Sequence, residues 1–295
     1  MTETTRDQWA QWLLHRRHGG DPDQLKTVLD FLYPIRDRVL ENARLGEGET
    51  LLDVGCGDGL IAFGALEKVK SSIVIFSDIS QDLLDHTETL TREMGLNEHA
   101  RFLRAPANDL SALPDSTIDA VTTRSVLIYV AAKQKAFDEF LRVLKPGGRL
   151  SIFEPINRFG CPEPTERFAG YDVTPVMDIA AKVGEVYLRA QPVDTDPMMD
   201  FDEHDMLAFA EKSGFRDIHM ELEATVVNNT SPQRKISWEM WIKASPNPKA
   251  PTLEEAMREA LTPAEQETFV AHLRPLVEAG QSLHRQALMY LWAVK

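Results

Sequence analysis

Short apolar runs alternate with amphipathic segments in the first half of the chain. Runs rich in apolar residues at positions 50–54, 72–77, 100–104, 118–123 and 149–154 predict strands. Helices are predicted after the first, second and fourth runs, the last from Phe137, Phe140, Leu141 and Leu144 at helical spacing. Strands that alternate with helices indicate a parallel sheet with right-handed crossovers.

The same patterns continue on both sides of this alternating segment. Trp9, Trp12 and Leu13, and later Leu25, Val28, Leu29 and Leu32, recur at the spacing of two amphipathic helices. Two further strands are predicted at residues 216–227 and 287–295. Between them stand two capping boxes, Thr252 with Glu255 and Thr262 with Glu265, so the connection contains at least two helices.

The segment LLDVGCGDGL, residues 51–60, joins the first predicted strand to a helix. Glycines stand at every second position, Gly55, Gly57 and Gly59. Glycine adopts conformations closed to other residues and lets a ligand lie against main-chain amides. Because the turn leads into a helix N-terminus, which favours anionic groups, we expect a nucleotide-like ligand here. Leu60 stands where the dinucleotide fingerprint has its third glycine, which disfavours an NAD-dependent oxidoreductase.

Four motifs then follow in the order found in class I S-adenosylmethionine (SAM)-dependent methyltransferases. Asp53 with the glycine triplet resembles the family's acid-x-G-x-G-x-G motif, and IVIFSDIS places Asp78 at the end of the second strand. DSTIDAVTTRSVLIYV resembles the fourth strand and its exit loop, and FLRVLKPGGRLSIFEP resembles the following helix, turn and fifth strand. The chain thus resembles the broad ubiquinone/menaquinone-biosynthesis and natural-product methyltransferase group.

The resemblance implies an α/β fold with a doubly wound, seven-stranded, mostly parallel sheet. Its strand order would be 3-2-1-4-5-7-6, with the last strand antiparallel. We expect an N-terminal helical segment (1–45), a Rossmann-like core (46–156), an insertion or lid (157–200), more of the core (201–228), a helical insertion (229–284) and a final core strand (285–295). The second insertion is unusually long for the hairpin that the last two strands form in this family.

The resemblance also assigns SAM as cofactor and S-adenosylhomocysteine (SAH) as product. It implies that Asp78 accepts hydrogen bonds from the ribose hydroxyls and that Ile79 flanks the adenine. Pro106 stands where many relatives have an acid that contacts the adenine, so Asn108 or Asp109 is expected to replace it. The predicted cofactor-binding residues are Asp53, Gly55, Cys56, Gly57, Asp58, Gly59, Asp78, Ile79, Ala107, Asn108, Arg124 and Ser125.

Charge and composition narrow the class of partner. The formal net charge is −14, whereas sequence-independent nucleic-acid binding needs clustered Lys and Arg, so we expect no nucleic-acid partner. No run approaches the ~18 apolar residues of a membrane span, and the N-terminus lacks a secretory pattern. Two cysteines make no disulfide framework. We expect a cytoplasmic monomer or homodimer without a membrane partner.

Two polar segments outside the motifs each have a structural and a functional interpretation. Arg16 and Arg17 either follow a helix that stops at Gly19 or reach the cofactor carboxylate or an anionic substrate. Asp202, Glu203 and Asp205 are typical of a helix N-terminus. These acids lack a recognised ligand spacing, so no metal site is predicted.

Methyl transfer from a sulfonium is an in-line displacement, for which a protein chiefly aligns the reactants and excludes water. A hydroxyl or amine acceptor is helped by a general base, for which His15, His18, Glu154 and His204 are the candidates. The aromatic insertions are typical of lids and binding loops. The Trp238 and Trp241 pair either packs inside its insertion or forms a pocket wall. The predicted substrate-binding residues are Tyr33, Arg36, Tyr129, Tyr171, Trp238 and Trp241.

We therefore expect a SAM-dependent methyltransferase that acts on a small, partly apolar molecule. The loop TTRSVLIYV lacks the polar-Pro-Pro-aromatic motif of methyltransferases that act on amino groups of DNA or on protein amides. Two alternatives stay open. One is a protein or RNA methyltransferase with an open site, and the other is a regulatory protein that binds SAM without catalysis.

Overall fold

The computed structural model describes residues 6–17, 22–229 and 237–295. Its centre is a seven-stranded sheet of order β3-β2-β1-β4-β5-β9-β8, which confirms the predicted topology. The first five of these strands are parallel, and β9 runs antiparallel to both β5 and β8. The strands are β1 (Thr50–Val54), β2 (Ile73–Asp78), β3 (Ala100–Arg104), β4 (Ile118–Arg124), β5 (Leu144–Pro155), β8 (Arg216–Asn229) and β9 (Ser282–Val294).

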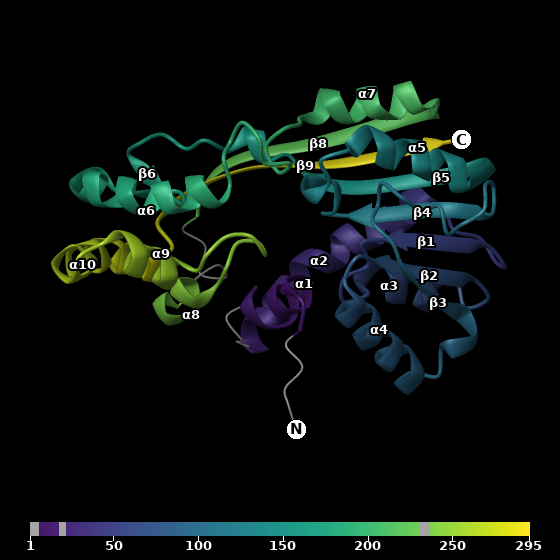
Figure 1. Ribbon diagram of the computed structural model, residues 1–295, viewed down its shortest axis with the longest axis horizontal. Helices are drawn as coiled ribbons and strands as arrows, with labels where there is room; N and C mark the ends of the chain where they lie inside the picture. The colour runs from purple at the N-terminus through teal and green to yellow at the C-terminus, as the bar shows by residue number, and fades with distance from the viewer. Residues whose placement is uncertain (1–5, 18–21, 230–236) are drawn as a thin grey trace.

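Helices cover both faces of this sheet (Figure 1). One face carries α2 (Pro22–Ala43), α3 (Leu60–Lys68) and α4 (Gln81–Glu93), and the other carries α5 (Lys133–Val143) and α7 (Glu203–Ser213). Short 3-10 turns lie at η2 (Asn97–His99), η3 (Leu127–Tyr129), η4 (Asn157–Phe159) and η5 (Thr174–Val176). None of the helices in the described part of the chain combines the length and apolarity that crossing a membrane requires.

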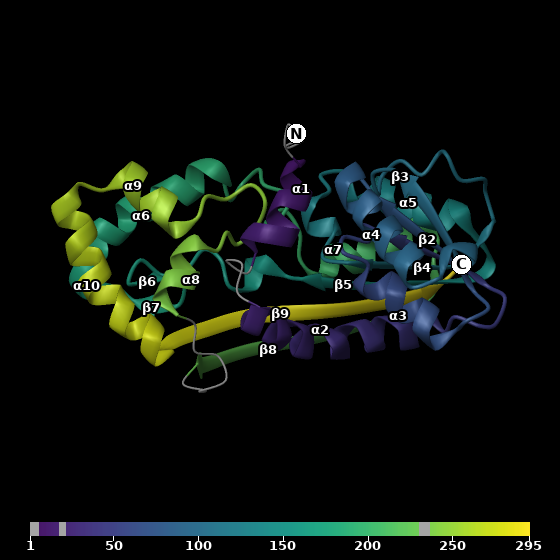
Figure 2. The same ribbon diagram turned by 90° about the horizontal axis from the view of Figure 1, so that it is seen from below.

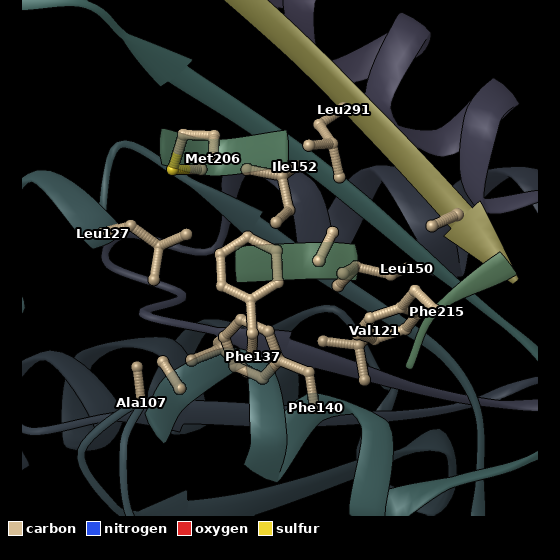
Figure 3. Close-up of a cluster of buried hydrophobic side chains, with 14 of the residues drawn as sticks. Ala107, Val121, Leu127, Phe137, Phe140, Leu150, Ile152, Met206, Phe215 and Leu291 are labelled. Atoms are coloured by element: carbon tan, nitrogen blue, oxygen red, sulfur yellow. The ribbon is translucent and has the colours of Figure 1, made fainter. Parts of the chain in front are cut away.

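The face under α5 is a continuous apolar core (Figure 3). Phe137 and Phe140 are fully buried there, as their helical spacing predicts. Leu144 continues the pattern and is buried, but it begins β5 instead of ending the helix. Pro146 explains the difference, because a proline disfavours the helical conformation in the residue before it, Lys145.

The two predicted insertions pack together and form one second lobe. The first contributes β6 (Arg167–Phe168), β7 (Tyr171–Asp172) and α6 (Met177–Ala190), and the second contributes α8 (Trp238–Lys243), α9 (Leu253–Ala260) and α10 (Pro263–Ala279). The predicted capping boxes begin α9 and α10. Side chains of both insertions share a separate buried core, which includes Tyr171, Val183, Trp238, Leu253 and Phe269.

The long strands β8 and β9 connect this lobe to the sheet (Figure 2). Residues 288–294 of β9 pair with β5, whereas the pairing of β9 with β8 continues to Ser282 and Asn229. Both strands therefore run past the end of β5 as a two-stranded ribbon, and the second lobe lies at its far end (Figures 1 and 2).

A helical segment near the N-terminus lies between the two lobes, and we call residues 7–17 the bridging segment (Figures 1 and 2). It consists of α1 (Gln8–Gln11) and the π-helix η1 (Trp12–Arg16). On the sheet side, Asp7 caps α1 and accepts a hydrogen bond from Ser80 Oγ at 2.7 Å. On the side of the second lobe, Trp12 Nε1 donates to the Ser245 carbonyl at 2.9 Å. The predicted stop at Gly19 lies outside the described residues.

Phe269 tests whether the second lobe adds to the stability of the whole chain. Its ring is fully buried in the core that both insertions share. We expect Phe269→Ala to lower the free energy of unfolding by about 3–5 kcal/mol, measured by urea denaturation. Glu267→Ala, on the exposed side of α10, is the control and is expected to stay within about 0.5 kcal/mol of wild type. An equally small effect at Phe269 would mean that the lobe unfolds independently.

Candidate functional site

The conformation and packing of the turn between β1 and α3 depend on glycines, which have no side chain. Gly55 has a φ of 67°, and a Cβ there would overlap the side chain of Val126. Gly57 has a φ of 56°, and its Cβ would approach Leu13 Cδ2 of the bridging segment to 3.1 Å. Position 55 therefore requires glycine, and the left-handed φ at position 57 favours it. The turn consequently presents main chain to the space in front of it.

That space is a cavity of about 340 Å³ at the carboxyl ends of the parallel strands, which we call the turn cavity. Ligands bind at this position on open α/β sheets. Trp9, Trp12 and Arg17 of the bridging segment form part of its lining. Eight of the twelve predicted cofactor residues line it, namely Gly55, Gly57, Asp78, Ile79, Ala107, Asn108, Arg124 and Ser125.

Asp78, the last residue of β2, holds its carboxylate at the edge of the turn cavity. Oδ2 accepts a hydrogen bond from the Gly57 amide and Oδ1 from the Ser80 amide, each at 2.9 Å. These two amides fix the orientation of the carboxylate, and each oxygen keeps a free lone pair. Burial raises the pKa of Asp78. The fixed pair of acceptors suits two neighbouring hydroxyl groups.

The other predicted cofactor residues lie outside the lining of the turn cavity. Asp53 is buried behind the turn, where Oδ1 accepts from Thr122 Oγ1 at 2.9 Å and burial raises the pKa to about 7. Its Oδ2 is buried without a hydrogen-bond partner among the described residues. Cys56 is also buried, which raises the pKa of its thiol. Asp58 and Gly59 line a separate groove.

Glu154, at the end of β5, organises the loop after β4. Oε1 accepts from the amides of Val126 and Leu127 at 2.8 Å, and Oε2 accepts from Ile128 at 3.4 Å. Ser125 just before them has a left-handed φ of 55°, so the chain reverses sharply at the cavity wall. Burial raises the pKa of Glu154 to about 7. Because backbone amides bind both of its carboxylate oxygens, this predicted base holds the loop after β4 in place.

Two guanidinium groups lie close enough in the turn cavity to influence each other. Arg17 comes from the bridging segment and Arg124 from the end of β4. Burial, and secondly the charge of Arg124, lower the pKa of Arg17 to about 10. Within residues 6–17, 22–229 and 237–295, neither forms an ion pair, whereas neighbouring Arg16 pairs with Glu255 at 2.6 Å. Each of these cations can therefore bind an anionic group.

Residues 52–152 match the family described as methyltransferase domain. Residues 52–152 therefore form a methyltransferase domain. The ubiquinone/menaquinone biosynthesis C-methyltransferase UbiE of Cronobacter sakazakii is 34% identical over 120 residues, which are 38% of this chain and 47% of that protein. The tRNA 5-carboxymethoxyuridine methyltransferase of Escherichia coli is 27% identical over 153 residues, 52% of this chain and 56% of that protein. The matches thus span about half the length of each relative.

A solved structure shows the same fold over most of the chain. It is the geranyl diphosphate C-methyltransferase from Streptomyces coelicolor A3(2), in complex with Mg²⁺, geranyl-S-thiolodiphosphate and SAH. The TM-score is 0.50 and the identity 16%, and the alignment covers 89% of this chain and 75% of the other. The likeness supports the architecture of the methyltransferase domain.

The loop after β3 has Pro106 where an acid was expected from the family motif, and Asn108 and Asp109 were the two predicted replacements. Pro106 and Asn108 line the turn cavity. Asp109 is exposed and accepts a hydrogen bond from the Ser111 amide at 3.2 Å, so it caps its own loop. Of the two predicted replacements for the missing acid, Asn108 is therefore the one in reach of a ligand.

The predicted bases lie away from the turn cavity as far as the structure describes them. His15 is exposed, with Nε2 2.9 Å from Arg6 Nη1. The side chain of His204 is 84% exposed at the start of α7, where Asp202 caps the helix. His18 lies outside the described residues. Asp202, Glu203 and His204 stand close enough to share a cation, but the capping role of Asp202 already accounts for its position.

The predicted substrate residues separate into four environments. Tyr129 lines the turn cavity, and burial raises its pKa to about 12. Trp241 lines a larger cleft beside the second lobe, whereas Tyr171 and Trp238 are buried in the core of that lobe. The remaining two, Tyr33 and Arg36, stack on each other and line the groove that contains Asp58.

Sequence reasoning left two aromatic residues of the cavity wall unassigned. Trp9 and Trp12 were not among the predicted site residues, yet both line the turn cavity, and Trp9 packs edge-on against Tyr129. Their place in the sequence could have indicated this role, because an aromatic helix that packs near a glycine turn can cover a ligand on that turn.

Glu154 is expected to make the stability of the protein depend on pH. Its pKa is about 7 in the folded protein against an ordinary value of 4.5, so its contribution to stability is full below pH 4.5 and is lost as the pH rises through 7. We expect the wild type to lose up to about 3 kcal/mol relative to Glu154→Gln over this interval. Urea unfolding at stepped pH measures the difference. Glu267→Gln, the same substitution at an exposed position of α10, is the control, and a flat difference for Glu154→Gln would contradict the assignment.

Proposed function

We propose that the protein transfers the methyl group of SAM to a small, partly apolar acceptor. The observation that carries the proposal is the turn cavity, in which bare main chain at Gly55 and Gly57 faces the fixed carboxylate of Asp78. The match of residues 52–152 to the methyltransferase-domain family supports it. SAH in the related geranyl diphosphate C-methyltransferase supports the same cofactor here.

The residues present fit SAM group by group. The two acceptor oxygens of Asp78 suit the ribose hydroxyls, and Ile79, whose side chain is 42% exposed, offers an apolar face to the adenine. Asn108 offers an amide at the edge of the adenine site. At the other end of the turn cavity, Arg124 matches the carboxylate of the methionine part.

The bound cofactor would supply a methyl group that its sulfonium already activates. The residues of the chain then need to position the acceptor and keep water away. Trp9, Trp12 and Tyr129 cover the turn cavity and are suited to both tasks. Glu154 contributes indirectly, because it fixes the loop that carries Arg124 and Ser125.

The acceptor class is tested by transfer of labelled methyl from SAM into an extract, followed by separation of small molecules from macromolecules. We expect the label in the small-molecule fraction, because the turn cavity is covered by aromatic side chains. The E. coli relative that acts on tRNA makes RNA the informative alternative. Label in RNA or protein would contradict the small acceptor, and SAM binding without any transfer would favour a non-catalytic role.

The cofactor assignment is tested at Asp78. A charge-assisted hydrogen bond contributes about 1.5–3 kcal/mol, so we expect Asp78→Ala to weaken SAH binding about 10- to 100-fold in calorimetry. Asp109→Ala is a matched control, because this acid lies at the same edge of the sheet but outside the cavity lining. Equal affinities of both variants and wild type would remove Asp78 from the site.

A further inference from the structure

A second and larger space, about 790 Å³, lies beside the turn cavity, and we call it the lobe cleft. Phe31 and Leu32 of α2 form one wall, and the second lobe forms the other. Its lining is mainly apolar, with Phe168, Tyr187, Leu188 and Trp241 from the second lobe. Phe31 and Leu188 are 46% and 51% exposed. The lobe cleft therefore offers apolar surface to a ligand.

Arg17 belongs to both spaces, because it lines the turn cavity and the lobe cleft. The bridging segment that carries it is held on the second lobe, where Trp12 Nε1 donates to the Ser245 carbonyl and the Ser245 amide donates to the Arg16 carbonyl. The guanidinium thus stands at the junction of the two spaces. Among the residues that the structure describes, Arg17 is the one that lines both spaces, so a ligand that reached from the lobe cleft into the turn cavity would pass this cation.

The two other charged residues of the lobe cleft are Arg167 and Glu163, whose opposite charges lie near enough to influence each other. Arg167 Nη1 donates to the Gly170 carbonyl at 2.9 Å. Glu163 accepts hydrogen bonds from the amides of Ala169 and Gly170, and burial raises its pKa. Arg17 has no ion-pair partner among the residues that the structure describes. The charge pattern of the cleft therefore favours an anion at the junction and an uncharged, apolar group elsewhere.

Gly184 keeps one wall of the lobe cleft open. It lies inside α6, where glycine costs about 0.5–1 kcal/mol relative to alanine. A Cβ at this position would meet no atom within 4 Å, so packing inside the protein does not require a glycine. A larger side chain would instead project into free space at the cleft wall.

We propose that the lobe cleft binds the apolar body of an amphipathic acceptor whose anionic head contacts Arg17. This inference rests on the proposed function, since it names the acceptor class of the same site. The head group would lie where the two spaces meet, and the body would extend between α2 and α6. The bridging segment, which touches both lobes, would cover the head.

The test uses calorimetry with three ten-carbon probes in the presence of saturating SAH. Decanoate, decanol and decyltrimethylammonium differ in the charge of the head group. We expect decanoate to bind about 10- to 100-fold more tightly than decanol, and the cation to bind most weakly. Each pair of methylene groups added to the carboxylate is expected to tighten binding about tenfold. Equal binding of all three heads would overturn the role of Arg17, and no binding would overturn the cleft.

Two variants separate the cleft from the cofactor site. Gly184→Leu fills the cleft and is expected to weaken decanoate about tenfold or more while SAH affinity stays unchanged. Glu185→Leu, at an exposed position of α6 outside the cleft lining, is the control and is expected to change neither affinity. Arg17→Gln is expected to reduce decanoate to the affinity of decanol without loss of SAH. If Arg17→Gln instead weakens SAH as strongly as decanoate, Arg17 belongs to the cofactor.

The outcomes also distinguish this inference from the proposed function. If the protein binds SAH but not decanoate, the cofactor assignment stands and the acceptor proposal is overturned. A protein that binds neither SAH nor SAM would overturn the proposed function, whatever it does with decanoate. An unchanged decanoate affinity in folded Gly184→Leu would place the probe outside the lobe cleft.

Discussion

The site depends on the contact between Gly55 and Val126. The side chain of Val126 occupies the volume where any Cβ at position 55 would lie, so the loops after β1 and β4 can close only over a bare backbone. Glu154 holds the amide of Val126 from the end of β5. Three adjacent strand ends are thereby fixed relative to each other, and the turn cavity in front of them takes its shape from this packing.

Much of the sheet was readable from the sequence because its strands are buried and bounded by local signals. The predicted bounds of β1 and β3 agree with the structure, and those of β2 and β4 differ by one residue. The larger deviations concern β5, β8 and β9, which all extend further than predicted. The added length of β8 and β9 lies in a ribbon beyond the sheet, where the apolar pattern that marks a buried strand is weaker.

The site was predictable only where its residues belong to local motifs. The eight predicted cofactor residues that line the turn cavity follow strand ends, so topology alone brings them together. The second lobe is different, because Tyr171 and Trp241 meet through packing of distant segments, and neither segment identifies its partner. The role of Arg17 was also not predictable from the sequence. Whether it ends a helix or reaches a ligand depends on what the helix before it packs against.

The shared core of the second lobe also bears on how such a protein could arise. Each insertion supplies one part of that core, and either part without the other would expose a continuous apolar surface to water. Stepwise acquisition would therefore pass through an ancestor prone to aggregation, unless a partner covered that surface. A lineage that gains or loses one insertion is accordingly under pressure to gain or lose both.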